Sequence, residues 1–178
     1  MANRAQRTAP SAPLPAAAVA VILVPDPLSV LLIRRSEREG DPWSGHVALP
    51  GGREEPEDTD LIATAIRETA EEVGILLDRS VLLGALDDVA PRSRVPPIFT
   101  VRPFVFGLGG QPKLQLSSEV ASAHWEPLET LRRADARGEL ALTIAGMTRR
   151  FPSYQTAAGT LWGMTERVLS EAVRRLDG

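Results

Sequence analysis

Two short apolar runs near the N-terminus constrain the fold more than any other feature of the chain. Residues 17–24 and 28–34 are rich in Val, Ile and Leu, and Pro25-Asp26-Pro27 separates them. Each run is too short to span a membrane, and the prolines rule out one continuous helix. The first run, preceded by basic residues, has the layout of a signal peptide, but no small-residue cleavage site follows it. We therefore predict two buried strands and a cytoplasmic protein.

The composition indicates one globular domain and excludes several classes of site and partner. The chain has 178 residues, 43% of them hydrophobic and 24% charged, which is enough for one core. We predict a disordered N-terminal tail over 1–15 and a single domain over 16–178. The net charge of −3 argues against nucleic acid or a membrane surface as partners. With no cysteine and two histidines, any bound metal should be a hard cation on oxygen ligands.

The rest of the chain mixes strands with two amphipathic helices. One helix is expected over 59–73, with Asp58 or Thr59 as its N-terminal cap and Gly74 at its end. A second helix is expected over 159–176. The expected strands are 47–52, 81–89, 99–108 and a strand running into a helix start over 120–131, with an edge strand within 108–119 and a loop over 150–154. These elements predict an α/β sandwich.

Three glutamates crowd one face of the helix expected over 59–73. Glu68, Glu71 and Glu72 stand at i, i+3 and i+4 in RETAEEVGI, on the face away from the core contacts of the helix. Like charges at this spacing repel by roughly 0.2–0.5 kcal/mol per pair. A solvated helix face and a cation site both account for the cluster. Arg67 can orient it by pairing with Glu71 or with a carboxylate of the loop.

A pair of glycines upstream favours the cation site. Gly51 and Gly52 end a short strand and precede an acidic loop and the glutamate helix. Glycine lets the backbone approach a ligand or a metal closely, and a main-chain carbonyl can add a further ligand. The combination of paired glycines, an acidic loop and RE-x-x-EE-x-G is far more specific than any one of its parts.

Residues 52–75, GREEPEDTDLIATAIRETAEEVGI, resemble the Nudix box, the signature of the Nudix hydrolase family. The family pattern is Gly, five residues, Glu, seven residues, Arg-Glu, an apolar residue, any residue, Glu-Glu, any residue, Gly and an apolar residue. This chain follows the pattern from Arg67 to Ile75, with Thr69 in the apolar position. Asp58 stands where the first Glu is expected, and eight residues rather than seven separate it from Arg67.

The flanking sequence resembles the coenzyme A pyrophosphatases of that family. LLIRRS at 31–36 is similar to the subgroup's signature upstream of the box, and Pro152, Tyr154 and 162–165 are similar to its late residues. Three positions depart from the upstream signature, namely Ile33, Gly40 and Leu49. The resemblance implies a Nudix-type α/β/α sandwich with a mixed β-sheet.

The resemblance also implies a Mg²⁺-dependent hydrolase, with Mn²⁺ as an alternative cation, in which water attacks a diphosphate. It assigns as metal ligands Glu68, Glu71, Glu72 and the carbonyl of Gly51. Arg67 would hold the loop of the box, and Gly52 would lie against the substrate. The general base would be Glu68 or Glu119, and an exposed loop carboxylate accounts for Glu119 equally well.

Several basic and aromatic side chains are candidates for contact with a nucleotide. The arginines are Arg34, Arg35, Arg92, Arg94 and Arg102, each of which is also consistent with an ordinary surface position. Arg35 is the first choice because it lies within the 31–36 signature. Trp43 and His46 either line the site or pack beside it. The expected packing residues, in the core or at its edge, are His124, Trp125 and Trp162.

Three functions are consistent with this sequence. The first is hydrolysis of coenzyme A or its thioesters to 3′,5′-ADP and 4′-phosphopantetheine or its acyl derivative, which LLIRRS favours. The second is hydrolysis of another nucleoside diphosphate derivative, such as ADP-ribose, a sugar nucleotide or a noncanonical nucleoside triphosphate. The third is a domain that senses a nucleotide without cleaving it, against which the intact glutamates argue. The expected partner is a small-molecule nucleotide; dimers are common in the family, and a homodimer is left open.

Overall fold

The computed structural model describes residues 15–40, 43–91, 99–144 and 146–178. The predicted N-terminal tail lies outside these residues except for Pro15, where the first strand begins, so the division into tail and domain stays a prediction. None of the described helices is long and apolar enough to cross a membrane. The cytoplasmic location also stays a prediction.

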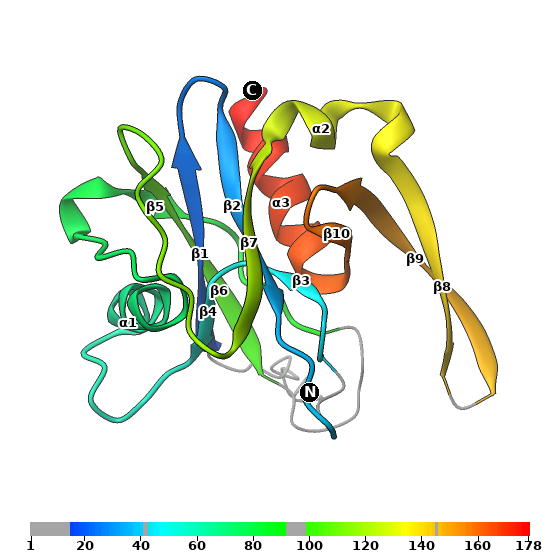
Figure 1. The fold of residues 1–178 in the computed structure, drawn as a ribbon, viewed down its shortest axis with the longest axis horizontal. Helices are drawn as coiled ribbons and strands as arrows, with labels where there is room; N and C mark the ends of the chain where they lie inside the picture. Colours follow the sequence, from blue (N-terminus) through cyan, green and yellow to red (C-terminus); the bar gives the residue numbers. More distant parts are fainter. Residues whose placement is uncertain (1–14, 41–42, 92–98, 145) are drawn as a thin grey trace, which may run out of the picture.

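A mixed sheet forms the centre of the molecule (Figure 1). Its strands are β1 (Pro15–Val24), β2 (Ser29–Arg35), β3 (Val47–Ala48), β4 (Gly51–Arg53), β5 (Leu82–Ala85), β6 (Thr100–Gly107) and β7 (Val120–Pro127). β1 pairs in parallel with β6 and antiparallel with β2 and β4. β2 also pairs antiparallel with β3 and β7, and β5 with β6. The predicted mixed sheet is thus confirmed.

The paired glycines lie where β1 and β2 separate. The two strands pair at one end, where Leu23 is opposite Val30. At the other end β3 pairs with β2 while β4 pairs with β1, so that Gly52 lies opposite Ala18. The Ala20 N–H donates to the Pro50 carbonyl at 2.8 Å, between the two short strands. The glycines therefore belong to the central sheet and are held by its hydrogen bonds.

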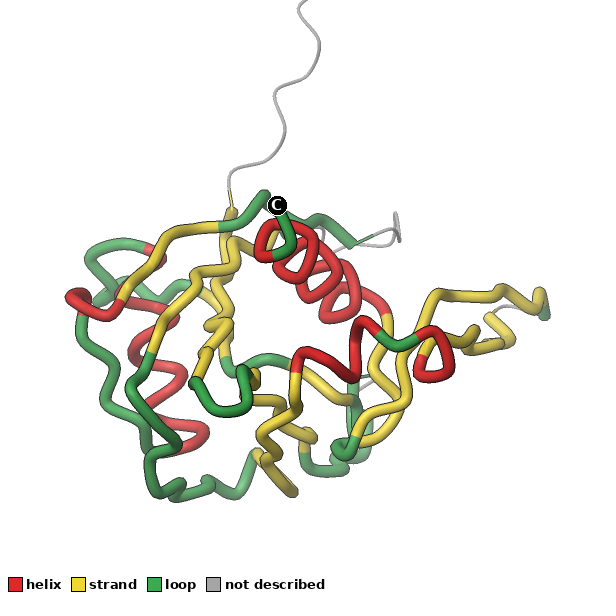
Figure 2. Tube along the Cα trace, turned by 90° about the horizontal axis from the view of Figure 1, so that it is seen from above, coloured by secondary structure: helices red, strands yellow, loops and turns green. Residues whose placement is uncertain are grey.

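Helices cover both faces of the sheet, which explains why β1 and β2 are continuous apolar runs (Figure 2). α1 (Leu61–Val73) covers one face and α3 (Gly163–Leu176) the other. Successive residues of a strand point to opposite faces. Ile22 belongs to the core cluster that includes residues of α1, and Val21 to the cluster that includes residues of α3. The shorter helices are α2 (Leu128–Arg132), η1 (Arg79–Val81) and η2 (Ala134–Ala136).

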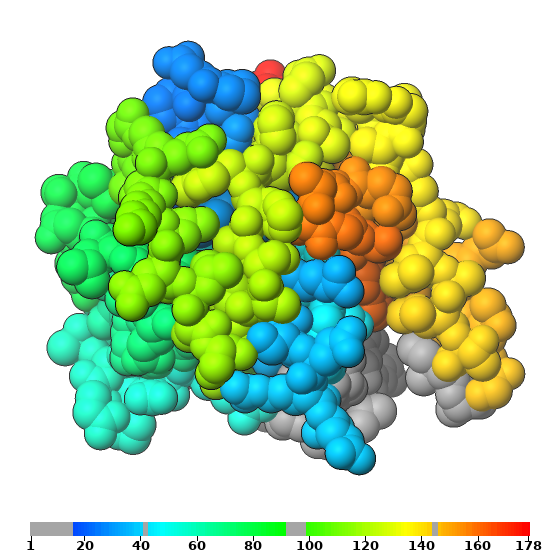
Figure 3. Space-filling model, in the orientation of Figure 1, coloured from blue at the N-terminus to red at the C-terminus, as the bar shows by residue number. Residues whose placement is uncertain are grey.

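The C-terminal third differs from the prediction. β8 (Arg137–Ile144), β9 (Met147–Thr156) and β10 (Gly159–Trp162) form a separate antiparallel sheet, whose β8–β9 hairpin lies at the edge of the molecule (Figures 1 and 3). The loop predicted over 150–154 is part of β9, because Pro152 lies just before the first residue of β9 that pairs with β10 and so costs that side no hydrogen bond. The second helix begins at Gly163, whose φ of 72° ends the strand that precedes it. Residues 108–119 form no strand.

Candidate active site

The glutamate helix α1 has well-defined ends. Asp60 is the N-terminal cap, and its side chain accepts from the Ala63 N–H at 2.9 Å. Gly74 ends the helix in the left-handed conformation, with φ 73° and a hydrogen bond from its N–H to the Ala70 carbonyl. The predicted end is confirmed, whereas the predicted caps, Asp58 and Thr59, are wrong by one or two residues.

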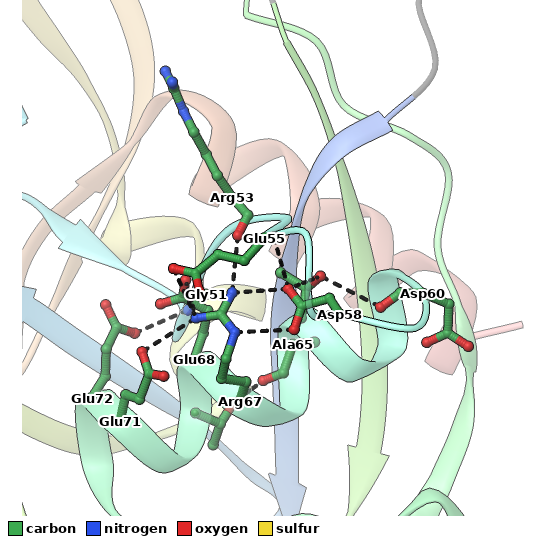
Figure 4. Close-up of polar contacts among 12 residues, drawn as sticks. Gly51, Arg53, Glu55, Asp58, Asp60, Ala65, Arg67, Glu68, Glu71 and Glu72 are labelled. Carbon is green, nitrogen blue, oxygen red and sulfur yellow. Dashed lines mark hydrogen bonds and ion pairs between the residues drawn. The ribbon is translucent and has the colours of Figure 1, made fainter.

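Asp58 does not cap the helix because it is paired with Arg67 (Figure 4). The two Asp58 oxygens accept from Nε and Nη2 of Arg67, each at 3.0 Å, in a two-pronged contact. Arg67 Nη2 also donates to the Arg53 carbonyl at 3.0 Å. Hydrogen bonding to Arg67 holds the pKa of Asp58 far below its usual range. Asp58 and Arg67 are therefore paired although eight residues, rather than seven, separate them in the sequence. Through Asp58 and the Arg53 carbonyl, Arg67 connects two points of the acidic loop to the helix.

Arg67 also neutralises part of the glutamate cluster. Its Nη1 donates to Glu68 Oε1 at 3.0 Å and to Glu71 Oε2 at 3.2 Å. The prediction that Arg67 pairs with Glu71 or with a loop carboxylate is confirmed, since it does both. These contacts offset the repulsion expected among the glutamates of one helix face.

Glu72 is the member of the cluster that differs most from the prediction. Its residue is only 5% exposed, so it does not lie on a solvated face. Its Oε2 accepts from the Gly51 N–H at 3.0 Å, because the helix packs against β4 at this point. Burial raises the pKa of the Glu72 carboxyl from 4.5 to about 7, and the hydrogen bond from Gly51 only partly offsets that effect. A carboxylate without full solvation gains more than an exposed one from a nearby cation.

The glycines bring the sheet into contact with the same cluster. A Cβ atom added to Gly52 would lie 2.2 Å from Glu68 Oε1, so the Glu68 carboxylate packs directly on this glycine. A Cβ atom on Gly51 would lie 2.3 Å from the Ala18 carbonyl of β1, and the Gly51 φ is 152°. Close contacts therefore favour glycine at both positions, and the groups that approach them are a carboxylate and the neighbouring strand. The predicted approach of a ligand or a metal stays a prediction.

The proposed metal ligands are close to one another, but their carboxylates do not converge on a common point. Within the described residues, no three Asp, Glu or His side chains are grouped so that they could hold a metal ion. Glu68 and Glu71 are turned to Arg67, and Glu72 to Gly51. The donor chemistry still fits Mg²⁺, because the set consists of carboxylates and a main-chain carbonyl and includes the poorly solvated Glu72. The ligand set stays a proposal.

Glu119 approaches the cluster from the loop before β7. Its negative charge helps to raise the pKa of Glu72, after burial and the charge of Glu68. Its Oε1 accepts from Arg38 Nη2 at 3.0 Å, and its main-chain carbonyl accepts from the Ser36 N–H at 2.8 Å. Arg38 is a contact that the sequence analysis missed, because 81 residues separate the partners.

A cavity of about 600 Å³ adjoins the cluster and contains several predicted residues. Those that line it include Arg35, Trp43, His46, Gly51, Gly52 and Trp162. Trp162 also packs against His46 and Phe151, in agreement with the packing prediction. Arg102 instead forms a two-pronged pair with Asp88, at 2.8 and 2.9 Å. Trp125 packs against the core as predicted. Arg92 and Arg94 lie outside the described residues.

We expect Asp58→Asn to destabilise the protein by about 2 kcal/mol, since it weakens charge-assisted hydrogen bonds to a largely buried partner. Urea unfolding at pH 7 measures the loss. The matched control is Asp135→Asn, which removes an exposed pair with Arg133 and should change the free energy of unfolding by less than about 1 kcal/mol. Equal losses in the two variants would contradict the anchoring role of Asp58. The Asp58 contribution should also decline at acidic pH, because its folded pKa is lowered and its stabilisation is lost as pH falls through that value.

Comparison with known proteins indicates the family to which this chain belongs. The family model described as NUDIX domain matches residues 14–151. A Nudix hydrolase, NudL, of Photorhabdus laumondii is 28% identical over 90% of this chain and 84% of its own length. The mitochondrial coenzyme A diphosphatase NUDT8 of Homo sapiens is 30% identical over 83% of this chain, a match that spans 63% of that protein. An uncharacterized protein of Schizosaccharomyces pombe is 49% identical over 57% of this chain, but the match spans only 32% of it.

Solved structures share the fold at low sequence identity. The NUDIX domain of Shewanella oneidensis NrtR, crystallised with ADP ribose, superposes with a TM-score of 0.62 and 21% identity, over 90% of this chain and 86% of that chain. An Ap4A hydrolase of C. elegans has a TM-score of 0.57 and 22% identity, over 91% and 97% of the two chains. These similarities confirm the predicted sandwich and leave the substrate to be argued from other observations.

Proposed function

This chain belongs to the Nudix hydrolase family, and we propose that it cleaves the diphosphate bond of coenzyme A or its thioesters. The products would be 3′,5′-ADP and 4′-phosphopantetheine or its acyl derivative. The observation that carries hydrolysis is the contact of Glu68 and Glu72 with the paired glycines beside a cavity. The choice of coenzyme A is supported by LLIRRS at 31–36 and by similarity to a coenzyme A diphosphatase.

Nudix hydrolases use divalent cations, and we propose Mg²⁺, with Mn²⁺ as the alternative. Its ligands would be Glu68, Glu71, Glu72 and the carbonyl of Gly51. Such a cation neutralises phosphate charge and lowers the pKa of water that it binds. For Glu68 and Glu71 to bind it, their carboxylates would exchange contacts with Arg67 for contacts with the cation, while Asp58 keeps Arg67 in place.

The remaining groups of the chain would position the reactants. Arg35, which lines the cavity and whose charge lowers the pKa of Glu72, would bind a phosphate next to the carboxylates. Glu119 or Glu68 would accept the proton of the attacking water. Glu119 is the more accessible of the two, with its side chain 52% exposed against 18% for Glu68.

A product assay tests this function. The purified protein is incubated with coenzyme A, acetyl-coenzyme A, ADP-ribose and a noncanonical nucleoside triphosphate, each with Mg²⁺ or with EDTA, and mass spectrometry identifies the products. We expect 3′,5′-ADP from coenzyme A, only with Mg²⁺. Cleavage of ADP-ribose or the triphosphate alone would keep a Nudix hydrolase and overturn the choice of substrate. Hydrolysis in EDTA would overturn the role of the cation.

A further inference from the structure

The cavity next to the glycines has an aromatic wall built from distant parts of the chain. Trp43 and His46 come from the segment before β3, and Trp162 from the end of β10. The Trp43 and His46 rings meet edge to face, with centroids 5.8 Å apart and an interplanar angle of 82°. The His46 and Trp162 centroids are 5.1 Å apart at 63°. Trp43 is 50% exposed and lines the cavity.

A second aromatic ring in the cavity, Phe99, lies next to the positively charged guanidinium of Arg53. The guanidinium of Arg53 lies 4.9 Å from the centre of the Phe99 ring, and both residues line the cavity. Arg53 directly follows Gly52, yet its side chain points away from the carboxylate cluster, whereas its carbonyl accepts from Arg67 (Figure 4). The cavity thus combines flat apolar surfaces with a guanidinium, and Arg35 adds another.

Aromatic rings and guanidinium groups in one cavity suit the nucleotide half of a nucleotide-linked diphosphate better than its other half. Gly51 and Gly52 line the cavity and also contact Glu72 and Glu68, so a diphosphate at the carboxylates has one of its two substituents in the cavity. A pantetheine arm is a flexible chain with no flat face to stack. A nucleobase is planar and stacks on aromatic side chains. The phosphates of a nucleotide suit Arg53 and Arg35.

We propose that this cavity binds the nucleobase of the substrate against Trp43 and Trp162, while Arg53 contacts a phosphate of the same nucleotide. The assignment rests on the proposed diphosphate hydrolysis for its orientation. It makes the aromatic wall the part of the site that distinguishes nucleotides from diphosphates without a base.

Tryptophan fluorescence tests the proposal without metal or turnover. The chain has three tryptophans, and Trp125 packs against the core and is not among the described residues that line the cavity. The W125F variant therefore reports on the cavity, and the W43F/W162F double variant, which keeps only Trp125, is its matched control. Each is titrated in EDTA with adenosine 3′,5′-bisphosphate, ribose 5-phosphate and 4′-phosphopantetheine, after circular dichroism has shown that it is folded.

We expect saturable quenching of W125F by the adenosine bisphosphate only, and none in the double variant. Trp43→Leu, at a half-exposed position, should weaken this binding about tenfold in a titration followed by calorimetry. Quenching by phosphopantetheine instead, or an unchanged affinity in Trp43→Leu, would overturn the assignment of the base. Coenzyme A hydrolysis with no nucleotide quenching would overturn this proposal and leave the proposed function standing. Quenching by the adenosine bisphosphate without hydrolysis of any diphosphate would overturn the proposed function and leave the assignment of the base standing.

Discussion

Replacing Glu72 by glutamine is expected to reduce hydrolysis about a hundredfold or more. Glutamine has nearly the same shape and can still accept from the Gly51 N–H, but it lacks the negative charge that a cation requires. A bound cation contributes several kcal/mol to such reactions, and about 3 kcal/mol corresponds to a hundredfold in rate. Steady-state kinetics with coenzyme A and saturating Mg²⁺ measures the loss. Glu129→Gln, an exposed position on α2, is the control and should keep wild-type activity.

The same variant is expected to be more stable than the wild type when both are free of metal. The folded pKa of Glu72, about 7, lies above the 4.5 of an unperturbed carboxyl. Between these two pH values the folded state retains a proton that the unfolded chain has released, so the stability of the wild type falls as pH rises. The cost is at most about 3.5 kcal/mol at pH 8, from about 1.4 kcal/mol per pH unit. Glutamine does not titrate and avoids this cost.

Thermal unfolding in EDTA measures the difference. At pH 8 the glutamine variant should unfold several degrees above the wild type, at about 2–4 °C per kcal/mol, and at pH 5 the two should converge. Added Mg²⁺ should raise the unfolding temperature of the wild type and not that of the variant. If the two proteins unfold alike in EDTA at pH 8, Glu72 is not poorly solvated. If Mg²⁺ raises both unfolding temperatures equally, Glu72 is not a ligand of the cation.

Gly52→Ala is the second change with a large expected effect on activity. The new Cβ would lie 2.2 Å from Glu68 Oε1 and 2.4 Å from its Cδ, so the carboxylate has to move. The φ angle of Gly52 is not positive, and the group displaced is the end of a flexible side chain, so the fold should persist. Misplacing a reacting group by about 1 Å can cost a hundredfold in rate. We expect a loss of that order in kcat/KM, with an unfolding temperature close to that of the wild type.

Two other glycines provide matched comparisons. Gly109→Ala places its Cβ in open space at a residue whose φ is not positive, so activity and stability should both be unchanged. Gly51→Ala puts its Cβ 2.3 Å from the Ala18 carbonyl at a φ of 152°, so it should unfold the protein at a lower temperature. Full activity in Gly52→Ala would show that the position of the Glu68 carboxylate does not matter for catalysis.

The sequence predicts best where a structure depends on neighbours along the chain. The β1 and β2 runs and the end of α1 at Gly74 need only hydropathy and the backbone freedom of glycine. The burial of Glu72 was missed because it depends on β4, which reaches α1 only through its pairing with β1. β9 was missed because Pro152 indicates a loop unless its partner strands are known.

Contacts across long distances in the chain decide most of the candidate site. Glu119 meets Arg38 across 81 residues, and Trp162 meets His46 where β10 approaches β3. Neither pair has a local pattern that would indicate it. The carboxylate cluster could be predicted because its glutamates lie on one helix. The cavity could not be predicted, because its residues are far apart in the sequence.

The anchor at Arg67 has a consequence for how related chains are recognised. The additional residue lies between Asp58 and Arg67, yet the Arg67 guanidinium still binds Asp58 and the Arg53 carbonyl, so the connection to the helix can be one residue longer while these contacts are kept. A search pattern with a fixed count between the glycine and the arginine would therefore reject this chain. A pattern that allows the loop to vary, and asks only for an acid within reach of the arginine, would retain it and others in which the loop has gained or lost a residue.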